Sequence, residues 1–178
     1  IELTKYLLKY GHLSIDIVDG QQVSTHNIAE LIIGDLAIDG LSFQNPVYNQ
    51  ILQTYTEQWR ELGVGVEVPS SIFVNHHNPD VSSAAVDILT SDDNYVASSL
   101  WKMKEIHIES ESELLSQGVP RAILLYKSKA IERMERDLNL KLQNPELDDN
   151  ELSNLLQQLK ELHHIKVQLA KKVDRLIP

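Results

Sequence analysis

Apolar residues recur at helical spacing through two stretches near the C-terminus, and this pattern constrains the fold more than any other feature of the chain. In the first stretch they recur at spacings of three, four or seven, at Ile123, Leu124, Ile131, Met134, Leu138 and Leu142. In the second they hold a heptad register that Lys166 interrupts, at Leu152, Leu155, Leu159, Leu162, Leu169, Val173 and Leu176. The pattern predicts two long helices folded back on each other along one apolar seam.

Start and stop signals set the bounds of these helices. Pro120 suits a first helical turn, where the missing N–H of proline has no cost. Asn144-Pro145 ends the first helix, because proline lacks the donor and disfavours α geometry at the residue before it. Asp148 and Glu151 have the spacing of a capping box that opens the second helix. Two helices of this kind would span ~35–45 Å each, so part of the seam is expected to bind a partner.

The charge is distributed unevenly along the chain. The net charge is −10, and residues 1–120 hold 5 basic and 17 acidic side chains, whereas residues 121–178 hold 11 and 9. We therefore predict two domains, an acidic helical-bundle subdomain at 1–118 and a C-terminal helical hairpin at 119–178. The acidic body repels a phosphate backbone, so no direct nucleic-acid binding is expected from it.

Composition excludes several kinds of site and of protein. The chain has no cysteine, which excludes disulfides, thiolate metal sites and cysteine nucleophiles. No apolar run approaches the ~20 residues of a membrane helix, and no signal peptide is visible, so a cytoplasmic location is expected. The chain begins with Ile1, and we expect it to be a fragment of a larger protein.

The body is predicted to be an all-α bundle of about six short helices. The expected segments are 1–10, a helix opened by Asn27 and Glu30, one from Asn45-Pro46 to Gly63, and 70–77, 80–89, 95–103 and 110–115. Residues 13–18, 64–68 and 106–108 have the alternation of extended chain. Trp59 and Trp101 are expected to be largely buried.

A leucine-rich first helix, a helix opened by Asn-Pro, two short helices and a long hairpin follow one another in this chain. The hairpin closes with the sequence from Leu162-His163-His164 to Lys171-Lys172. This order resembles the C-terminal helicase-binding domain of bacterial DNA primase, over essentially the whole chain and most clearly at 1–11, 120–129 and 159–172.

The resemblance implies a bundle similar in fold to the N-terminal domain of the replicative helicase. It also implies that the hairpin docks on the N-terminal domains of that hexameric helicase and couples primer synthesis to unwinding during DNA replication. The parent protein would be a primase, a nucleotidyltransferase. The zinc-ribbon cysteines and paired metal-binding aspartates of the primase family are absent here, so the fragment itself is not expected to be an enzyme or to need a cofactor.

The hairpin supplies the expected partner-binding residues, which are Leu142, Leu147, Leu162, Ile165, Leu169, Lys172, Val173 and Leu176. Either end of the hairpin could dock. The resemblance and the Lys171-Lys172 pair favour the last two turns, with the tip as a second contact.

Two alternatives stay open. His76, His77 and Asp80 could seed the site of a small metal-dependent hydrolase, but a metal needs three or four ligands arranged around it, and neighbouring residues on a helix point to different faces. A helix-end cluster is therefore the favoured interpretation. In the second alternative, two hairpins pair as a homodimer with no foreign partner.

Overall fold

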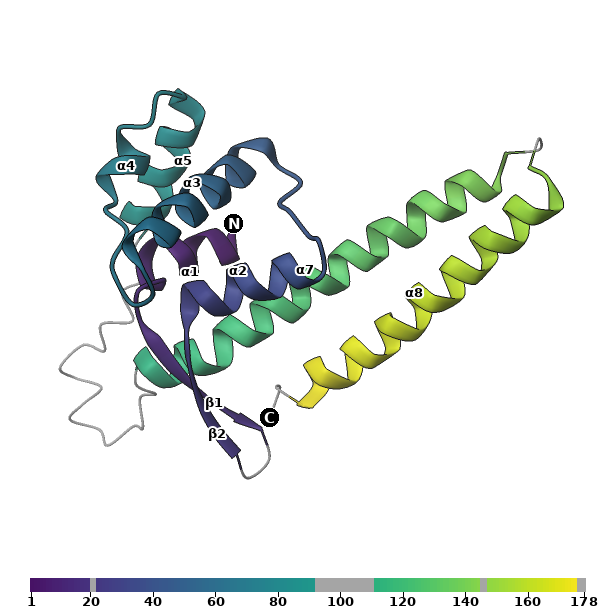
Figure 1. Cartoon of the computed structure of the whole chain (residues 1–178), viewed down its shortest axis with the longest axis horizontal. Coiled ribbons are helices and arrows are strands. Elements are labelled where there is room, and N and C mark those ends of the chain that lie inside the picture. The colour runs from purple at the N-terminus through teal and green to yellow at the C-terminus, as the bar shows by residue number, and fades with distance from the viewer. Residues whose placement is uncertain (20–21, 92–110, 145–146, 176–178) are drawn as a thin grey trace. The chain divides into compact units, whose positions relative to one another are not determined.

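The computed structural model of the chain describes residues 1–19, 22–91, 111–144 and 147–175. These residues are mainly helical, with a small two-stranded sheet, as Figure 1 shows. The chain divides into two compact units, Ile1–Val119 and Pro120–Pro178, called unit 1 and unit 2 below. None of the helices in the described ranges is both long and apolar enough to cross a membrane.

Unit 1 is built from short helices around an aliphatic and aromatic core. The helices are α1 (Glu2–Tyr10), α2 (Ile28–Ile38), α3 (Pro46–Leu62), α4 (Ser71–Val74) and α5 (Pro79–Thr90). At the centre of the core the rings of Tyr55 and Phe73 stack with their centroids 6.0 Å apart. Both rings are at most 2% exposed. Trp59, which we expected to be largely buried, is half-buried.

Asparagine side chains begin three of these helices. The Oδ1 of Asn27 accepts the N–H of Glu30 at 3.0 Å, that of Asn45 accepts Val47 at 2.9 Å, and that of Asn78 accepts Asp80 at 3.0 Å. Each bond satisfies a donor that a helix start leaves without a partner. The predicted starts at Asn27 and Asn45-Pro46 are thus confirmed.

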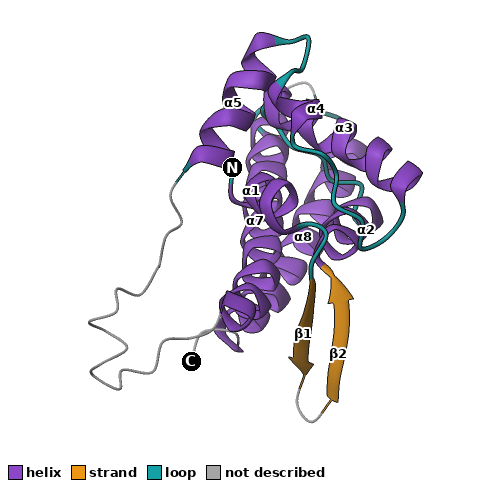
Figure 2. Cartoon of the chain, turned by 90° about the vertical axis from the view of Figure 1, so that its left-hand side faces the viewer, coloured by secondary structure: helices purple, strands orange, loops and turns teal. Residues whose placement is uncertain are grey.

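The all-α prediction is incomplete, because strands β1 (Ser14–Asp19) and β2 (Gln22–Asn27) form an antiparallel pair (Figure 2). An extended segment was expected at β1, but β2 was not. The sequence of β2 has one apolar residue and no apolar alternation. Its own residues therefore do not predict a strand, and the evidence for one is its pairing with β1. The strand expected at 64–68 is absent, and the positive φ angles of Gly63 and Gly65 (96° and 80°) show why extended geometry fails there.

The first long helix begins earlier than predicted. Helix α7 spans Glu111–Leu142 and carries Pro120 in its interior, although Pro120 was expected at a first turn. Proline there removes one backbone hydrogen bond from the helix. Two residues before it, Gly118 passes Tyr6 so closely that a Cβ would lie 2.5 Å from the tyrosine Oη. The helix expected at 95–103, with Trp101, and the extended segment at 106–108 lie outside the described residues.

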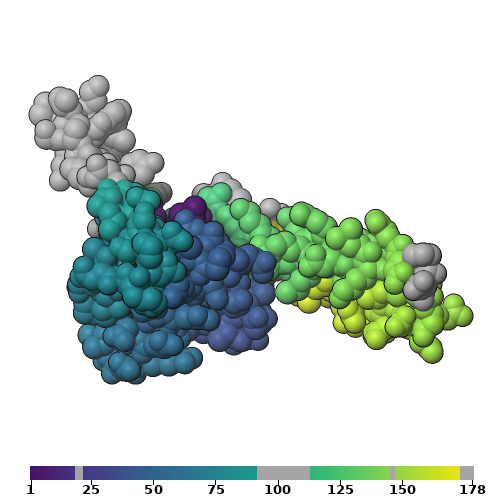
Figure 3. Space-filling model, turned by 90° about the horizontal axis from the view of Figure 1, so that it is seen from above, coloured from purple at the N-terminus to yellow at the C-terminus, as the bar shows by residue number. Residues whose placement is uncertain are grey.

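Unit 2 contains the rest of α7 and helix α8 (Asp149–Arg175). α7 ends before Pro145, as predicted. The capping box at the start of α8 is confirmed in both directions, because the N–H of Glu151 donates to Asp148 Oδ1 at 2.7 Å and the N–H of Asp148 donates to Glu151 Oε2 at 3.3 Å. In the space-filling view of Figure 3 the side chains of α7 and α8 lie against each other.

Candidate functional site

Helix α8 has a half-buried row of side chains, and its members are Leu155, Leu159, Leu162, Lys166 and Leu169. They recur every three or four residues, which places them on one face of the helix. Within unit 2 the Nζ of Lys166 lies 2.6 Å from Oε2 of Glu135 on α7, so this face is turned toward α7 at that level. The lysine that interrupts the predicted heptad register thus has a specific partner.

Beside this row α8 carries a second, exposed set of residues that we call the α8 flank, Leu152, Leu156, His163 and Val167. At 100° per residue these positions fall within about 60° of one another around the helix. The three apolar members are 40%, 50% and 41% exposed. Sequence analysis missed the flank because the heptad pattern selects the seam and assigns its neighbours to the polar surface. The signal was the recurrence of apolar residues one position outside the seam.

The predicted partner-binding residues are distributed over several environments. Leu142, Leu147, Leu162 and Leu169 are half-buried, whereas Ile165 is 47% exposed and Lys172 is exposed. Val173 lies in α8, but its side chain is outside the described part, as is Leu176. Leu162 and Leu169 belong to the half-buried row, and Ile165 lies on the side of that row opposite the α8 flank.

The tip of unit 2 holds a shallow hollow of about 310 Å³. Its lining is Lys141, Asn144, Leu147, Glu151, Asn154, Leu155 and Gln158. Leu147 and Leu155 supply apolar surface, and polar side chains from the end of α7 and the first turns of α8 form the rim. Of the predicted partner-binding residues, Leu147 is the one that lines this hollow.

The histidine pair considered for a metal site has a structural role at the start of α5. The rings of His76 and His77 lie 4.2 Å apart between centroids. The Nδ1 of His76 accepts the N–H of Asn78 at 3.1 Å, and the side chain of Asn78 in turn donates to Gln50 at 2.9 Å. One ring nitrogen is therefore engaged in fixing the turn before α5. Among the described residues no three His, Cys, Asp or Glu side chains are grouped so that they could hold a metal ion.

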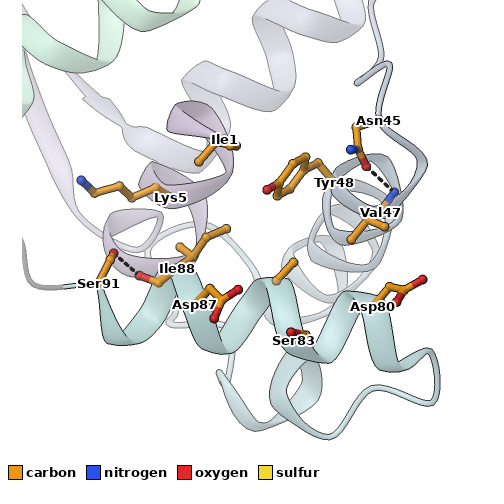
Figure 4. Close-up of a pocket in the computed structure, with 11 residues that line it drawn as sticks. Ile1, Lys5, Asn45, Val47, Tyr48, Asp80, Ser83, Asp87, Ile88 and Ser91 are labelled. Atoms are coloured by element: carbon orange, nitrogen blue, oxygen red, sulfur yellow. Dashed lines mark hydrogen bonds between the residues drawn. The ribbon is translucent and has the colours of Figure 1, made fainter.

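Unit 1 contains an open pocket of about 450 Å³ between α1, α3 and α5 (Figure 4). Asp80 and Asp87 lie along the α5 side and Tyr48 on the α3 side, with Val47 and Ile88 among the apolar lining residues. Its polar lining also includes the amine of Lys5 and the hydroxyls of Ser83 and Ser91.

Residues 1–176 match the model of the family DUF8430, described as a domain of unknown function. No curated protein and no solved structure matches the chain.

Proposed function

The chain belongs to the DUF8430 family, and we propose that it is a non-catalytic protein-interaction domain that docks on a helical partner through α8. The observation that carries this proposal is the α8 flank, where Leu152, Leu156 and Val167 are each at least 40% exposed. Removing apolar surface from water contributes about 25 cal/mol per Å², so a half-exposed leucine contributes on the order of 1–2 kcal/mol at an interface. Three such residues on one arc form a docking face of the kind that an amphipathic helix offers.

We further propose that α7 and α8 act as one antiparallel hairpin whose register is set by Glu135 and Lys166. A polar pair within an otherwise apolar seam disfavours shifted alignments, since any shift would leave a charge opposite leucine. A hairpin held in one register presents the α8 flank in a fixed conformation. This lowers the entropy cost of binding.

The partner that we propose is the N-terminal domain of the hexameric replicative DNA helicase, with a bacterial DNA primase as the parent protein. The order of the elements supports this, because a helical body followed by a pair of long helices is the arrangement that the resemblance implies. In this role the domain would couple primer synthesis to unwinding during DNA replication. The α8 flank extends from Leu152, near the start of α8, to Val167, toward its C-terminal turns. A partner that docks at either end of the hairpin could therefore contact it.

Isothermal titration calorimetry of the chain with the N-terminal domain of the replicative helicase from the same organism tests the proposal. The double variant Leu156→Asp with Val167→Asp is expected to weaken binding by about tenfold or more, because it places charge in the centre of an apolar contact. Val64→Asp with Val66→Asp is the matched control. These two valines are 56% and 44% exposed in the loop after α3, and their replacement is expected to leave the affinity unchanged.

Two further double variants separate the ends of the hairpin. Leu169→Asp with Val173→Asp alters the C-terminal turns, and Leu142→Ser with Leu147→Ser alters the tip. Circular dichroism establishes that each variant is folded. Failure of the wild-type chain to bind would exclude the helicase domain as partner, and wild-type affinity in a folded Leu156/Val167 variant would exclude the α8 flank as the contact.

A further inference from the structure

Among the described residues, no strand pairs with the outer edge of β2. Its residues Gln22, Val23, Ser24 and Thr25 are all exposed. β1 is its one neighbour in the sheet, and the described chain contains no third strand (Figure 2). A two-stranded sheet is marginal by itself, and a further strand would stabilise it.

The hydrogen-bond ladder determines which backbone groups of β2 point to this edge. The N–H of Ile28 donates to the carbonyl of Leu13 at 3.0 Å, and these two residues continue the register of the strands. Hydrogen-bonded and non-hydrogen-bonded pairs alternate along an antiparallel ladder. Counting from Leu13 and Ile28, Val23 and Thr25 fall in non-hydrogen-bonded pairs. Their N–H and C=O groups therefore point away from β1.

The β2 edge lacks the features that usually prevent edge strands from pairing. Such strands carry charged side chains, proline or a bulge. From Gln22 to Asn27 there is no Asp, Glu, Lys, Arg or Pro, and the register with β1 is unbroken. β1 differs, because it carries Asp16 and Asp19. β2 is thus open to pairing, and β1 is protected by charge.

One face of the sheet also exposes an apolar pair. Val18 and Val23 lie directly opposite each other, and they are 65% and 64% exposed. Beside them on the same face the hydroxyl of Thr25 donates to Asp16 at 2.6 Å. A strand added next to β2 would extend this row of side chains and cover part of Val23.

We propose that β2 pairs with β2 of a second copy of the chain, antiparallel about a two-fold axis at Ser24, to form a four-stranded sheet. In this register Val23 of each copy lies opposite Thr25 of the other. The outward N–H and C=O groups of these residues then meet as hydrogen-bonded pairs, and β-branched side chains lie side by side. The two Ser24 side chains face each other at the axis.

A second copy fits this edge better than a charged peptide does. The β2 edge offers no charge with which to recognise a basic or acidic strand, whereas self-pairing places no like charges opposite each other. A two-fold contact requires a self-complementary surface, and an uncharged antiparallel strand meets that condition. This inference is independent of the docking role of α8, because the two surfaces share no residue.

Sedimentation equilibrium of the whole chain over a dilution series tests the proposal. A monomer–dimer equilibrium is expected, and the dimer is expected to become tighter as salt rises, because two copies of net charge −10 repel each other and salt screens that repulsion. Val23→Pro removes an outward donor in each copy without breaking the β1–β2 ladder, and it is expected to raise the dissociation constant about tenfold or more.

Val18→Pro is the matched control. Val18 has the same side chain and exposure and also lies in a non-hydrogen-bonded pair, but it is on β1, and its replacement is expected to leave the dimer unchanged. If circular dichroism shows that the Val23→Pro variant is unfolded, Ser24→Lys takes its place as the test. It places two ammonium groups opposite each other at the two-fold axis and is expected to weaken the dimer. A chain that is monomeric throughout the series overturns the proposal. A dimer that persists in the folded β2 variants also overturns it. This includes a dimer that Leu156→Asp disrupts, because that dimer would form through α8.

Discussion

Lys166 on α8 takes the place of a leucine in a half-buried row, and its Nζ lies 2.6 Å from Oε2 of Glu135 on α7. The hydrogen bond with Glu135 is the main cause that raises the pKa of Lys166; burial opposes it, and the negative charges of Glu135 and Glu132 add to it. A lysine with a raised pKa in the folded chain stabilises that chain fully below the unfolded pKa, which is about 10.4. This stabilisation is lost as the pH rises through the folded pKa.

The first prediction concerns this ion pair. Between pH 8 and alkaline pH above the lysine pKa, the free energy of unfolding of the wild type is expected to fall more than that of Lys166→Met. Urea unfolding at a series of pH values measures the difference. Lys160→Met, an exposed lysine on the same helix, is the control and is expected to follow the wild type. Parallel curves for the wild type and Lys166→Met would show that the pair does not stabilise the fold.

The second prediction concerns Tyr55. Burial, with a smaller contribution from Glu67, raises the pKa of Tyr55 to about 12. A tyrosine whose pKa is raised stabilises the fold fully below pH 10, and this contribution is lost as the pH rises from about 10 to 12. The loss amounts to about 3 kcal/mol, since the pKa rises from 10.0 to about 12 and one pKa unit corresponds to 1.36 kcal/mol. In Tyr55→Phe this part of the pH dependence is expected to vanish, and tyrosinate absorbance follows the ionisation directly.

The third prediction concerns a buried hydroxyl. Thr4 is 0% exposed, and its Oγ1 has no hydrogen-bond partner. Replacing it with valine removes an unsatisfied polar group at nearly constant shape, and is expected to raise the free energy of unfolding by about 1 kcal/mol. Thr56→Val is the contrast, because the hydroxyl of Thr56 donates to the carbonyl of Leu52 at 2.7 Å, and its loss is expected to destabilise. Destabilisation by Thr4→Val would mean that the hydroxyl is satisfied in solution.

The fourth prediction compares two glycines inside helices. A Cβ at Gly34 in α2 would meet no atom within 4 Å, whereas one at Gly118 in α7 would lie 2.5 Å from Tyr6 Oη. Gly34→Ala is expected to stabilise by up to about 1 kcal/mol through helix propensity. Gly118→Ala is expected to destabilise by about the same amount through overpacking. In a Tyr6→Ala background the tyrosine ring no longer obstructs the new Cβ. Gly118→Ala is then expected to stabilise the chain, as measured by thermal unfolding.

The helix starts were predicted correctly because their signals are local in the sequence. The caps at Asn27 and Asn45 and the box formed by Asp148 and Glu151 depend on residues within one helical turn, so their geometry follows from spacing alone. β2 could not be predicted in this way, because Val23 is its one apolar residue and the strand is ordered by its pairing with β1. The early start of α7 was missed for a related reason. Pro120 is a helix-start signal, but α7 already begins at Glu111, and its residue Gly118 lies close to Tyr6.

The candidate site was predicted only in part. The heptad register identified Leu162 and Leu169, which the structure places in the half-buried row of α8. The exposed Leu156 and Val167 were not identified, because the heptad pattern assigns the positions beside the seam to the polar surface of the helix. The helicase contact stays a prediction for all of these residues.

The asparagine caps also bear on the chemical lifetime of the domain. Deamidation of asparagine requires attack by the backbone nitrogen of the next residue, and Asn45 and Asn78 are both followed by proline, which has no N–H. At Asn27 the side-chain amide is instead held by the carbonyl of Leu13 at 3.1 Å, in a residue that is 5% exposed. The asparagines that begin α2, α3 and α5 are thus protected against deamidation.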